Sequence, residues 1–441
     1  MDRNSLLENP YRPGAGHTPP FLAGRTREQE RFKRTLREKA PSDNFLVMGL
    51  RGFGKTVLLV SMRQMAEHDG WLWVGNDLSE SSSLSEERLA LRILTDLSNT
   101  LTAKFEADIS ARCKGKTPVD TTAAAEPADR QLHVFDTLKS VYETTPGLPS
   151  DKLIAALNRA TSIAARARLS GIILAYDEAQ CLMDHVQTNE FPMSTLVECI
   201  GTIQKQAPLV PILLVLSGLP QVQDALTETR TYTERMFQVL HLDRLTRDET
   251  WQAITVPMAD LMPPLYASKE LLSKAVDLSG GYPYLIQFFG KELVEQLLEN
   301  GGTLASAAFP TRDTLDRLDA GLFGARWSKT TDKQRDFLGL IARRENKART
   351  EFTAQEIGGL SRDGDLSGAQ ATQMLNALCE RGLIYRTRRG KFAFTVPMSE
   401  EMIIRRLTAE NVVADSWHGM SAAKAAMTGS STGKLWRWLG A

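Results

Sequence analysis

The chain has 441 residues, more than one ordinary domain accommodates, so two or three domains are expected. Its 53 Lys and Arg balance 53 Asp and Glu, and 42% of its residues are hydrophobic, so the overall charge does not indicate binding to nucleic acid or to a membrane surface. The 4 cysteines are scattered without a C-x-x-C pair, which argues against a zinc site and favours a reducing, cytoplasmic location. No apolar run approaches the ~20 residues that span a bilayer, so no membrane contact is expected.

In chain order, residues 1–40 are predicted to form a Pro- and Gly-rich arm followed by a charged helix. An α/β core should follow over residues 41–245. Its first strand is predicted at Asn44–Met48 and its second at Trp71–Val74, because both are short apolar runs that end in polar or glycine residues.

A glycine-rich motif separates the first strand from a helix that begins near Val57. The motif fits the pattern G-x-x-x-x-G-K-[ST], and the order strand, loop, helix is the context that a phosphate-binding P-loop requires. Backbone N–H groups of such a loop face the phosphates, its lysine reaches the β- and γ-phosphates, and its Thr ligates Mg²⁺. The predicted nucleotide-binding residues here are Gly49, Leu50, Arg51, Gly52, Phe53, Gly54, Lys55, Thr56 and Val57.

An apolar run at residues 171–176 ends in Asp177 and Glu178. Continuous apolar strands are typical of parallel sheets covered on both faces, and ligands bind at the carboxyl ends of their strands. We expect Asp177 to hold Mg²⁺ and Glu178 to polarise the attacking water as general base. Gln180 could orient water or the γ-phosphate, or could simply begin a helix.

A further strand is predicted at residues 209–216, followed by Ser217. A polar residue that ends the strand beside the acidic one can touch the γ-phosphate, so Ser217 is a candidate catalytic residue. A helix cap or turn serine is the alternative interpretation.

The remaining segments are predicted as a helical lid over 246–325, a winged-helix domain over 326–410 and a flexible tail over 411–441. Three helices are expected near 332–343, 353–360 and 369–381, and alternating residues around Gly390 predict a β-hairpin.

The hairpin concentrates basic residues that could meet DNA phosphates, namely Arg386, Arg388, Arg389 and Lys391. The third helix is not basic; its Gln370, Gln373 and Asn376 could read bases or could face solvent. Contact with duplex DNA and contact with a protein partner both remain open for this domain.

These motifs together resemble the AAA+ class of ATPases, most closely its origin-recognition-like branch and the related STAND signalling ATPases. Residues 9–16 and 19–28 are similar to the segment that packs on the adenine in that branch, which implies nucleotide contacts for Leu22, Gly24 and Arg25. Residues 279–287 resemble the G-x-P element of STAND proteins, which implies the same for Tyr282 and Pro283.

The resemblance also implies an arginine finger near residues 233–237. Arg235 is the candidate and Arg230 competes with it; an ordinary salt-bridged surface residue is the alternative. Such a finger acts across subunits, so it implies a nucleotide-dependent homo-oligomer. The lid lacks the sensor arginine that many AAA+ members carry, because no arginine lies within residues 280–298.

The expected fold is therefore an α/β P-loop NTPase with an AAA+-like parallel sheet, followed by an α-helical lid and a C-terminal winged-helix domain. The expected activity is Mg²⁺-dependent ATP hydrolysis in a DNA-associated switch of the loader, target-selection or mobile-element type. The alternative is a signalling or phage-defence switch whose winged helix binds protein. A small-molecule kinase fits poorly, because no substrate-pocket motif is visible.

Overall fold

The computed structural model describes residues 8–14, 16–38, 41–113, 127–229, 233–344, 351–360, 367–388 and 390–409. Arg230, Arg389 and the predicted tail 411–441 lie outside these residues, as does the side chain of Arg388. The chain divides into two compact units, Met1–Thr303 and Leu304–Ala441, each of which is described here by itself. The division falls inside the segment 246–325 that was predicted as a lid. No helix of the described residues is long and apolar enough to cross a membrane.

The first unit is built on a five-stranded sheet in the order β2-β3-β4-β1-β5. Every neighbouring pair is parallel, so all five carboxyl ends lie at one edge of the sheet. This confirms the α/β class and the parallel sheet predicted from the sequence. β5 was not predicted, because only two of its five residues are buried and it lacks the continuous apolar run of the others. The strands are β1 (Asn44–Met48), β2 (Trp71–Val74), β3 (Gly171–Tyr176), β4 (Ile212–Gly218) and β5 (Phe237–His241).

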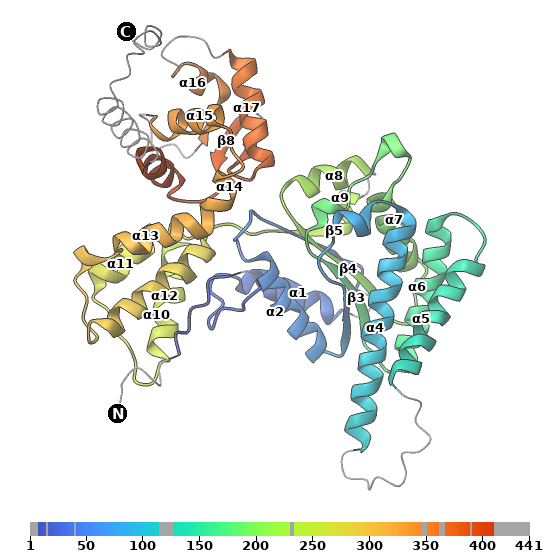
Figure 1. The fold of residues 1–441 in the computed structure, drawn as a ribbon. Helices are drawn as coiled ribbons and strands as arrows, with labels where there is room; N and C mark the ends of the chain where they lie inside the picture. Colours follow the sequence, from blue (N-terminus) through green and yellow to red (C-terminus); the bar gives the residue numbers. More distant parts are fainter. Residues whose placement is uncertain are drawn as a thin grey trace, which may run out of the picture. The chain divides into compact units, whose positions relative to one another are not determined.

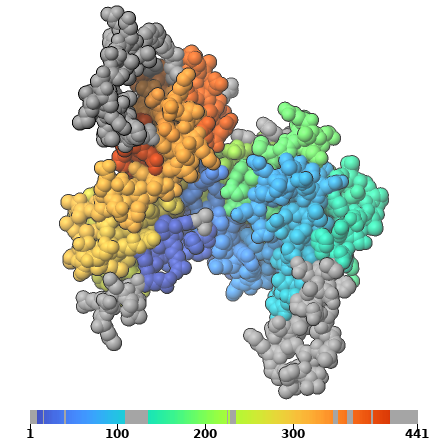
Figure 2. Space-filling model, viewed as in Figure 1, coloured from blue at the N-terminus to red at the C-terminus, as the bar shows by residue number. Residues whose placement is uncertain are grey.

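Helices cover both faces of this sheet (Figure 1). On one face, Phe32 of α1 (Thr26–Leu36) packs edge-on against Phe45 of β1 and Trp73 of β2, with centroid distances of 5.4 and 6.3 Å. α2 (Lys55–His68) lies on the same face, against β2 and β4. The opposite face carries a larger apolar core under four helices, α4 (Glu86–Cys113), α5 (Pro127–Thr144), α6 (Pro149–Arg166) and α7 (Pro192–Lys205). Figure 2 shows α4 (blue to cyan) and α5 and α6 (teal) as one continuous surface.

Short helices follow three strands at the carboxyl edge of the sheet: α3 (Glu80–Ser83) after β2, a 3₁₀ turn at Ala179–Cys181 after β3, and α8 (Gln221–Thr229) after β4. The short helix α9 (Thr233–Met236) instead leads directly into the amino end of β5.

The first unit ends in three helices, α10 (Arg247–Ala259), α11 (Lys269–Ser279) and α12 (Pro283–Glu299). The N-terminal arm packs on α10 and α12: Asn9 donates to the Lys291 carbonyl at 3.0 Å, and the buried Tyr11 hydroxyl donates to the Ile254 carbonyl. Gly290 permits this approach, because a Cβ there would lie 2.6 Å from the Tyr11 ring.

The second unit pairs helices with a three-stranded antiparallel sheet in the order β6-β8-β7. The predicted hairpin thus gains a third, two-residue strand that the sequence pattern was too short to reveal. Its core includes Phe337, Leu375 and Leu378, and Phe352 packs on Phe394 with ring centroids 5.6 Å apart. The elements are α13 (Arg312–Leu318), a π-helical turn (Asp319–Gly324), α14 (Ala325–Trp327), α15 (Asp332–Ala342), β6 (Glu351–Phe352), α16 (Ala354–Gly358), α17 (Gly368–Glu380), β7 (Ile384–Arg388), β8 (Lys391–Phe394) and a helix at 399–409.

Candidate nucleotide site

The glycine-rich loop joins β1 to α2 at the carboxyl edge of the sheet. Gly52 and Gly54 have φ of +84° and +85°, a left-handed conformation that glycine adopts without steric cost. Lys55 is buried, and its ammonium donates to the carbonyls of Gly49 at 3.0 Å and Leu50 at 3.2 Å. Burial lowers the pKa of Lys55, while the charges of Asp177 and Glu178 oppose that shift. The lysine therefore lies folded back along the loop, beside the carboxylates.

Thr56 and Asp177 are joined directly, although they are 121 residues apart in sequence. The Thr56 hydroxyl donates to Asp177 Oδ2 at 2.7 Å. A hydroxyl and a carboxylate oxygen are the hard donors that Mg²⁺ selects. The residues present thus fit a magnesium ion, which would take the place of their shared hydrogen bond.

Glu178 follows β3 in a left-handed conformation, with φ of 55° and ψ of 37°. Few non-glycine residues adopt this region, and they concentrate at functional sites. Its N–H donates to Asp177 Oδ1 at 2.8 Å, and its carboxylate accepts from Gln180 Nε2. Gln180 in turn accepts from the Leu219 N–H at 3.1 Å. Gln180 therefore links the Glu178 carboxylate to the segment after β4, a role that the sequence left open.

A third carboxylate lies beside these two and was not singled out in the sequence. Asp77, directly after β2, forms an isolated bridge with Asp177, and the Leu78 N–H donates to the Asp177 carbonyl at 3.0 Å. Although Asp77 is exposed, partial desolvation raises its pKa, and the charges of Asp177 and Glu178 add to the rise. The register of β2 against β3 was the missing signal, because it decides which side chains meet at the edge.

Ser217 is fully buried on β4, where it pairs with Val47 of β1. Within the described part of the chain its hydroxyl has no hydrogen-bond partner. A buried hydroxyl without a partner is unusual, since the large majority of such groups are paired.

Arg25 and Tyr282 both reach the glycine-rich loop and bond to its backbone. Arg25 is buried and donates to the Phe53 carbonyl at 3.1 Å and to the Asp243 carbonyl at 2.8 Å. The Tyr282 hydroxyl donates to the Arg51 carbonyl, and its ring lies edge-on to Phe53 at 5.4 Å. Among their predicted companions, Gly24 approaches Leu245 closely, whereas Leu22 and Pro283 are only half-buried.

The predicted finger Arg235 lies in the last turn of α9 and is exposed to solvent. Its surface position leaves the guanidinium available to another molecule.

The basic hairpin of the second unit is partly paired within that unit. Arg386 donates to Asn376 Oδ1 at 3.0 Å and lies 5.6 Å from the centroid of the Phe392 ring. Lys391 forms an ion pair with Glu351 at 3.5 Å. Two of the four predicted phosphate contacts are thus engaged with neighbouring side chains.

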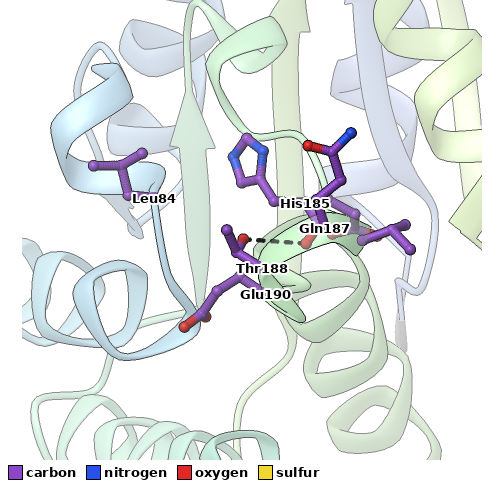
Figure 3. A pocket seen from close by; sticks show the side chains of 7 residues that line it. Leu84, His185, Gln187, Thr188 and Glu190 are labelled. Carbon is purple, nitrogen blue, oxygen red and sulfur yellow. Dashed lines mark hydrogen bonds between the residues drawn. The ribbon is translucent and has the colours of Figure 1, made fainter.

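A surface hollow lies in the segment that follows the acidic strand (Figure 3). Reciprocal bonds fix it to the start of α4: the Glu86 N–H donates to Glu190 at 3.1 Å, and the Phe191 N–H donates to Glu86 at 3.2 Å. No sequence motif indicated this hollow. Its lining residues are Leu84, Asp184, His185, Val186, Gln187, Thr188 and Glu190.

One family model matches the chain, over residues 320–403 of the second unit, and its description is "Domain of unknown function (DUF8462)". No curated protein matches the chain.

Solved structures of similar fold cover nearly the whole chain. The Walker-type ATPase paby2304 of Pyrococcus abyssi matches with a TM-score of 0.54 and 16% identity, over 87% of this chain and 96% of that chain. The ORC2 protein of Aeropyrum pernix, in ADPNP-ADP complexes, matches with a TM-score of 0.52 and 15% identity, over 92% of this chain and 100% of that chain. At such identities the likeness establishes the fold alone, a parallel five-stranded sheet with helices, shared with these two proteins.

Proposed function

We propose that this chain binds ATP and Mg²⁺ and hydrolyses the terminal phosphoanhydride bond. The observation that carries the proposal is the 2.7 Å contact between the Thr56 hydroxyl and Asp177, with Lys55 and Glu178 beside it. The glycine-rich loop, the proposed magnesium ligands and the proposed general base thus lie together at one edge of the sheet.

Each of these residues has a distinct role in the proposed reaction. The N–H groups of the loop and the start of α2 bind the phosphates, and Lys55 exchanges its bonds to Gly49 and Leu50 for phosphate oxygens. Thr56 and Asp177 would hold Mg²⁺, which neutralises charge on the phosphates when bound. Glu178 accepts a proton from the attacking water, and Gln180 orients its carboxylate.

The experiment is steady-state ATP hydrolysis by the purified chain, together with nucleotide affinity. Glu178→Gln should retain ATP binding and lower turnover at least about tenfold, because general bases contribute about 10²–10⁴ in rate. Lys55→Ala should lose tight binding. The exposed Glu80 supplies a matched control, Glu80→Gln, which should leave both quantities unchanged. Unchanged turnover in Glu178→Gln would show that another residue is the general base. Retained ATP affinity in Lys55→Ala would overturn the P-loop assignment.

We further propose that the ATPase acts as a DNA-associated switch of the loader, target-selection or mobile-element type. The second unit would be a winged helix, supported by three helices followed by the β7–β8 hairpin. The similar ORC2 fold supports the same class. Duplex DNA at low salt should then stimulate ATP hydrolysis severalfold.

A specific observation favours a second candidate, a signalling or phage-defence switch whose winged helix binds protein. Arg386 and Lys391 are paired with Asn376 and Glu351, so phosphate binding would first have to break these contacts. ATP hydrolysis that is indifferent to duplex DNA would favour this candidate.

A further inference from the structure

Side chains hold four of the first five carbonyls of the glycine-rich loop. Lys55, which belongs to the loop's own motif, donates to the carbonyls of Gly49 and Leu50. The other two donors come from distant segments of the chain. Tyr282, just before α12, donates to the Arg51 carbonyl. Arg25, just before α1, donates to the Phe53 carbonyl. Among the residues that the structure describes, only the Gly52 carbonyl in this run has no side-chain donor.

Holding a carbonyl also orients the next N–H group. A trans peptide is planar, and its C=O and N–H point in opposite directions. The bond from Tyr282 to the Arg51 carbonyl therefore fixes the direction of the Gly52 N–H. The bond from Arg25 to the Phe53 carbonyl fixes that of Gly54. Both N–H groups belong to the motif that binds phosphates.

The side chains of Arg25 and Tyr282 are themselves fixed in position. Tyr282 is 2% exposed and Arg25 6% exposed. Arg25 also bonds to the Asp243 carbonyl and lies 4.0 Å from Glu28, so its guanidinium has little freedom. Glycine at position 52 leaves room for the Tyr282 side chain, because a Cβ on Gly52 would lie 2.4 Å from the Tyr282 hydroxyl oxygen.

The backbone preceding Tyr282 is fixed as well. The Leu245 N–H donates to the Gly281 carbonyl at 2.8 Å, and a Cβ on Gly281 would lie 2.2 Å from the Leu245 carbonyl oxygen. The segment that begins α12 thus contacts the connection between β5 and α10 at van der Waals distance. A displacement of α12 would pull the Tyr282 hydroxyl away from the loop.

We propose that Arg25 and Tyr282 are positioning residues that preorganise the Gly52 and Gly54 N–H groups for the phosphates of a nucleotide. The arm and the helical segment 247–299 thereby set phosphate affinity without touching the nucleotide. This inference rests on the proposed ATP site and assigns these residues a role different from direct contact with the nucleoside.

The test compares Tyr282→Phe and Arg25→Lys with matched controls in the full-length chain. Tyr282→Phe removes only the hydroxyl, and Arg25→Lys keeps the charge but cannot reach two carbonyls with one planar group. Tyr284→Phe and Arg27→Lys are the controls, at a half-buried and an exposed position nearby. The measured quantities are the affinities for ADP, adenosine, ATP and GTP, and the melting temperature without nucleotide.

Tyr282→Phe and Arg25→Lys should each weaken ADP binding about threefold to tenfold, which corresponds to the loss of one hydrogen bond. Adenosine affinity and the ratio of ATP to GTP affinity should match those of the controls, and the melting temperature should fall only slightly, as expected for one lost hydrogen bond. The KM for ATP should rise, with kcat less affected.

Four results would overturn the proposal. Unchanged ADP affinity would show that the bonds do not preorganise the loop. Equal losses for ADP and adenosine, or an altered ratio of ATP to GTP affinity, would indicate direct nucleoside contact. Loss of cooperative unfolding in the two variants, with the controls unaffected, would assign the weaker binding to misfolding. Absence of nucleotide binding in the unmodified chain would instead refute the proposed function itself, so the two failures are distinguishable.

Discussion

Asp77 places a third carboxylate beside Asp177 and Glu178, at the edge of the sheet. Three negative charges in one place repel one another unless a cation lies among them. The carboxylate of Asp77 therefore destabilises the folded chain by repulsion, and the same repulsion favours binding of a metal ion.

The pH dependence of stability should report this repulsion. The pKa of Asp77 lies above its ordinary value of 3.8, so the folded state holds this proton more tightly than the unfolded state does. Its stabilising contribution is fully present below pH 3.8 and is lost as the pH rises through the folded-state value. Without Mg²⁺, Asp77→Asn should thus raise the melting temperature at pH 7, and the gain should shrink towards pH 4. A lower melting temperature at pH 7 would contradict this explanation.

Among the site residues, the sequence predicted those that belong to contiguous motifs. The P-loop, Asp177 and Glu178 were recognisable because local spacing encodes them, and Thr56 and Asp177 are in contact. Asp77 was not singled out and Gln180 was left between two interpretations, because their positions depend on strand register and on one side-chain contact. For Arg25 and Tyr282 the resemblance implied nucleotide contacts, whereas the structure places both on loop carbonyls.

At the scale of elements, four of the five strands of the first unit were predictable from continuous apolar runs. β5 was not, because two of its five side chains are only partly buried and a third is exposed, so it lacks a continuous apolar run. β6 was missed for a different reason: a strand of two residues exists only through its pairing with β8.

The packing of the N-terminal arm on α12 gives a prediction at this scale. In Gly290→Ala the new methyl group would lie 2.6 Å from the Tyr11 ring, so the arm or the helix must shift. We expect a destabilisation of about 1–3 kcal/mol, measured by chemical denaturation, as for other overpacked cores. Gly368→Ala in α17 is the control, since nothing lies within 4 Å of its Cβ, and it should be neutral or stabilising. Equal stability of the two variants would mean that the arm is not firmly seated.

The basic hairpin around β7 and β8 gives another prediction. Arg388→Glu/Arg389→Glu should abolish any DNA stimulation of ATP hydrolysis and reduce the salt dependence of duplex binding, because fewer counterions are released. Lys329→Glu/Lys333→Glu makes the same charge change at two exposed positions of the same unit and should have a smaller effect. Equal losses in both double variants would indicate that only the net charge of the unit matters.

At the scale of the whole molecule, the exposed position of Arg235 bears on whether the site is complete within one chain. An arginine supplied in trans stabilises charge on the transferred phosphoryl group and can contribute about 10³–10⁵ in rate. If Arg235 acts in this way, specific activity should rise with protein concentration, and Arg235→Ala should retain nucleotide binding while losing turnover.

Mixing two inactive variants tests this directly. Lys55→Ala lacks its own nucleotide site but still carries Arg235, whereas Arg235→Ala keeps its nucleotide site and lacks only the finger. A mixture should recover part of the ATPase activity that neither variant has alone, because one chain completes the site of the other. Arg230→Ala, tested in parallel, decides between the two arginines. Full activity in Arg235→Ala at every protein concentration would show that Arg235 is not part of the site. Recovery only in mixtures of Lys55→Ala with Arg230→Ala would identify Arg230 as the finger.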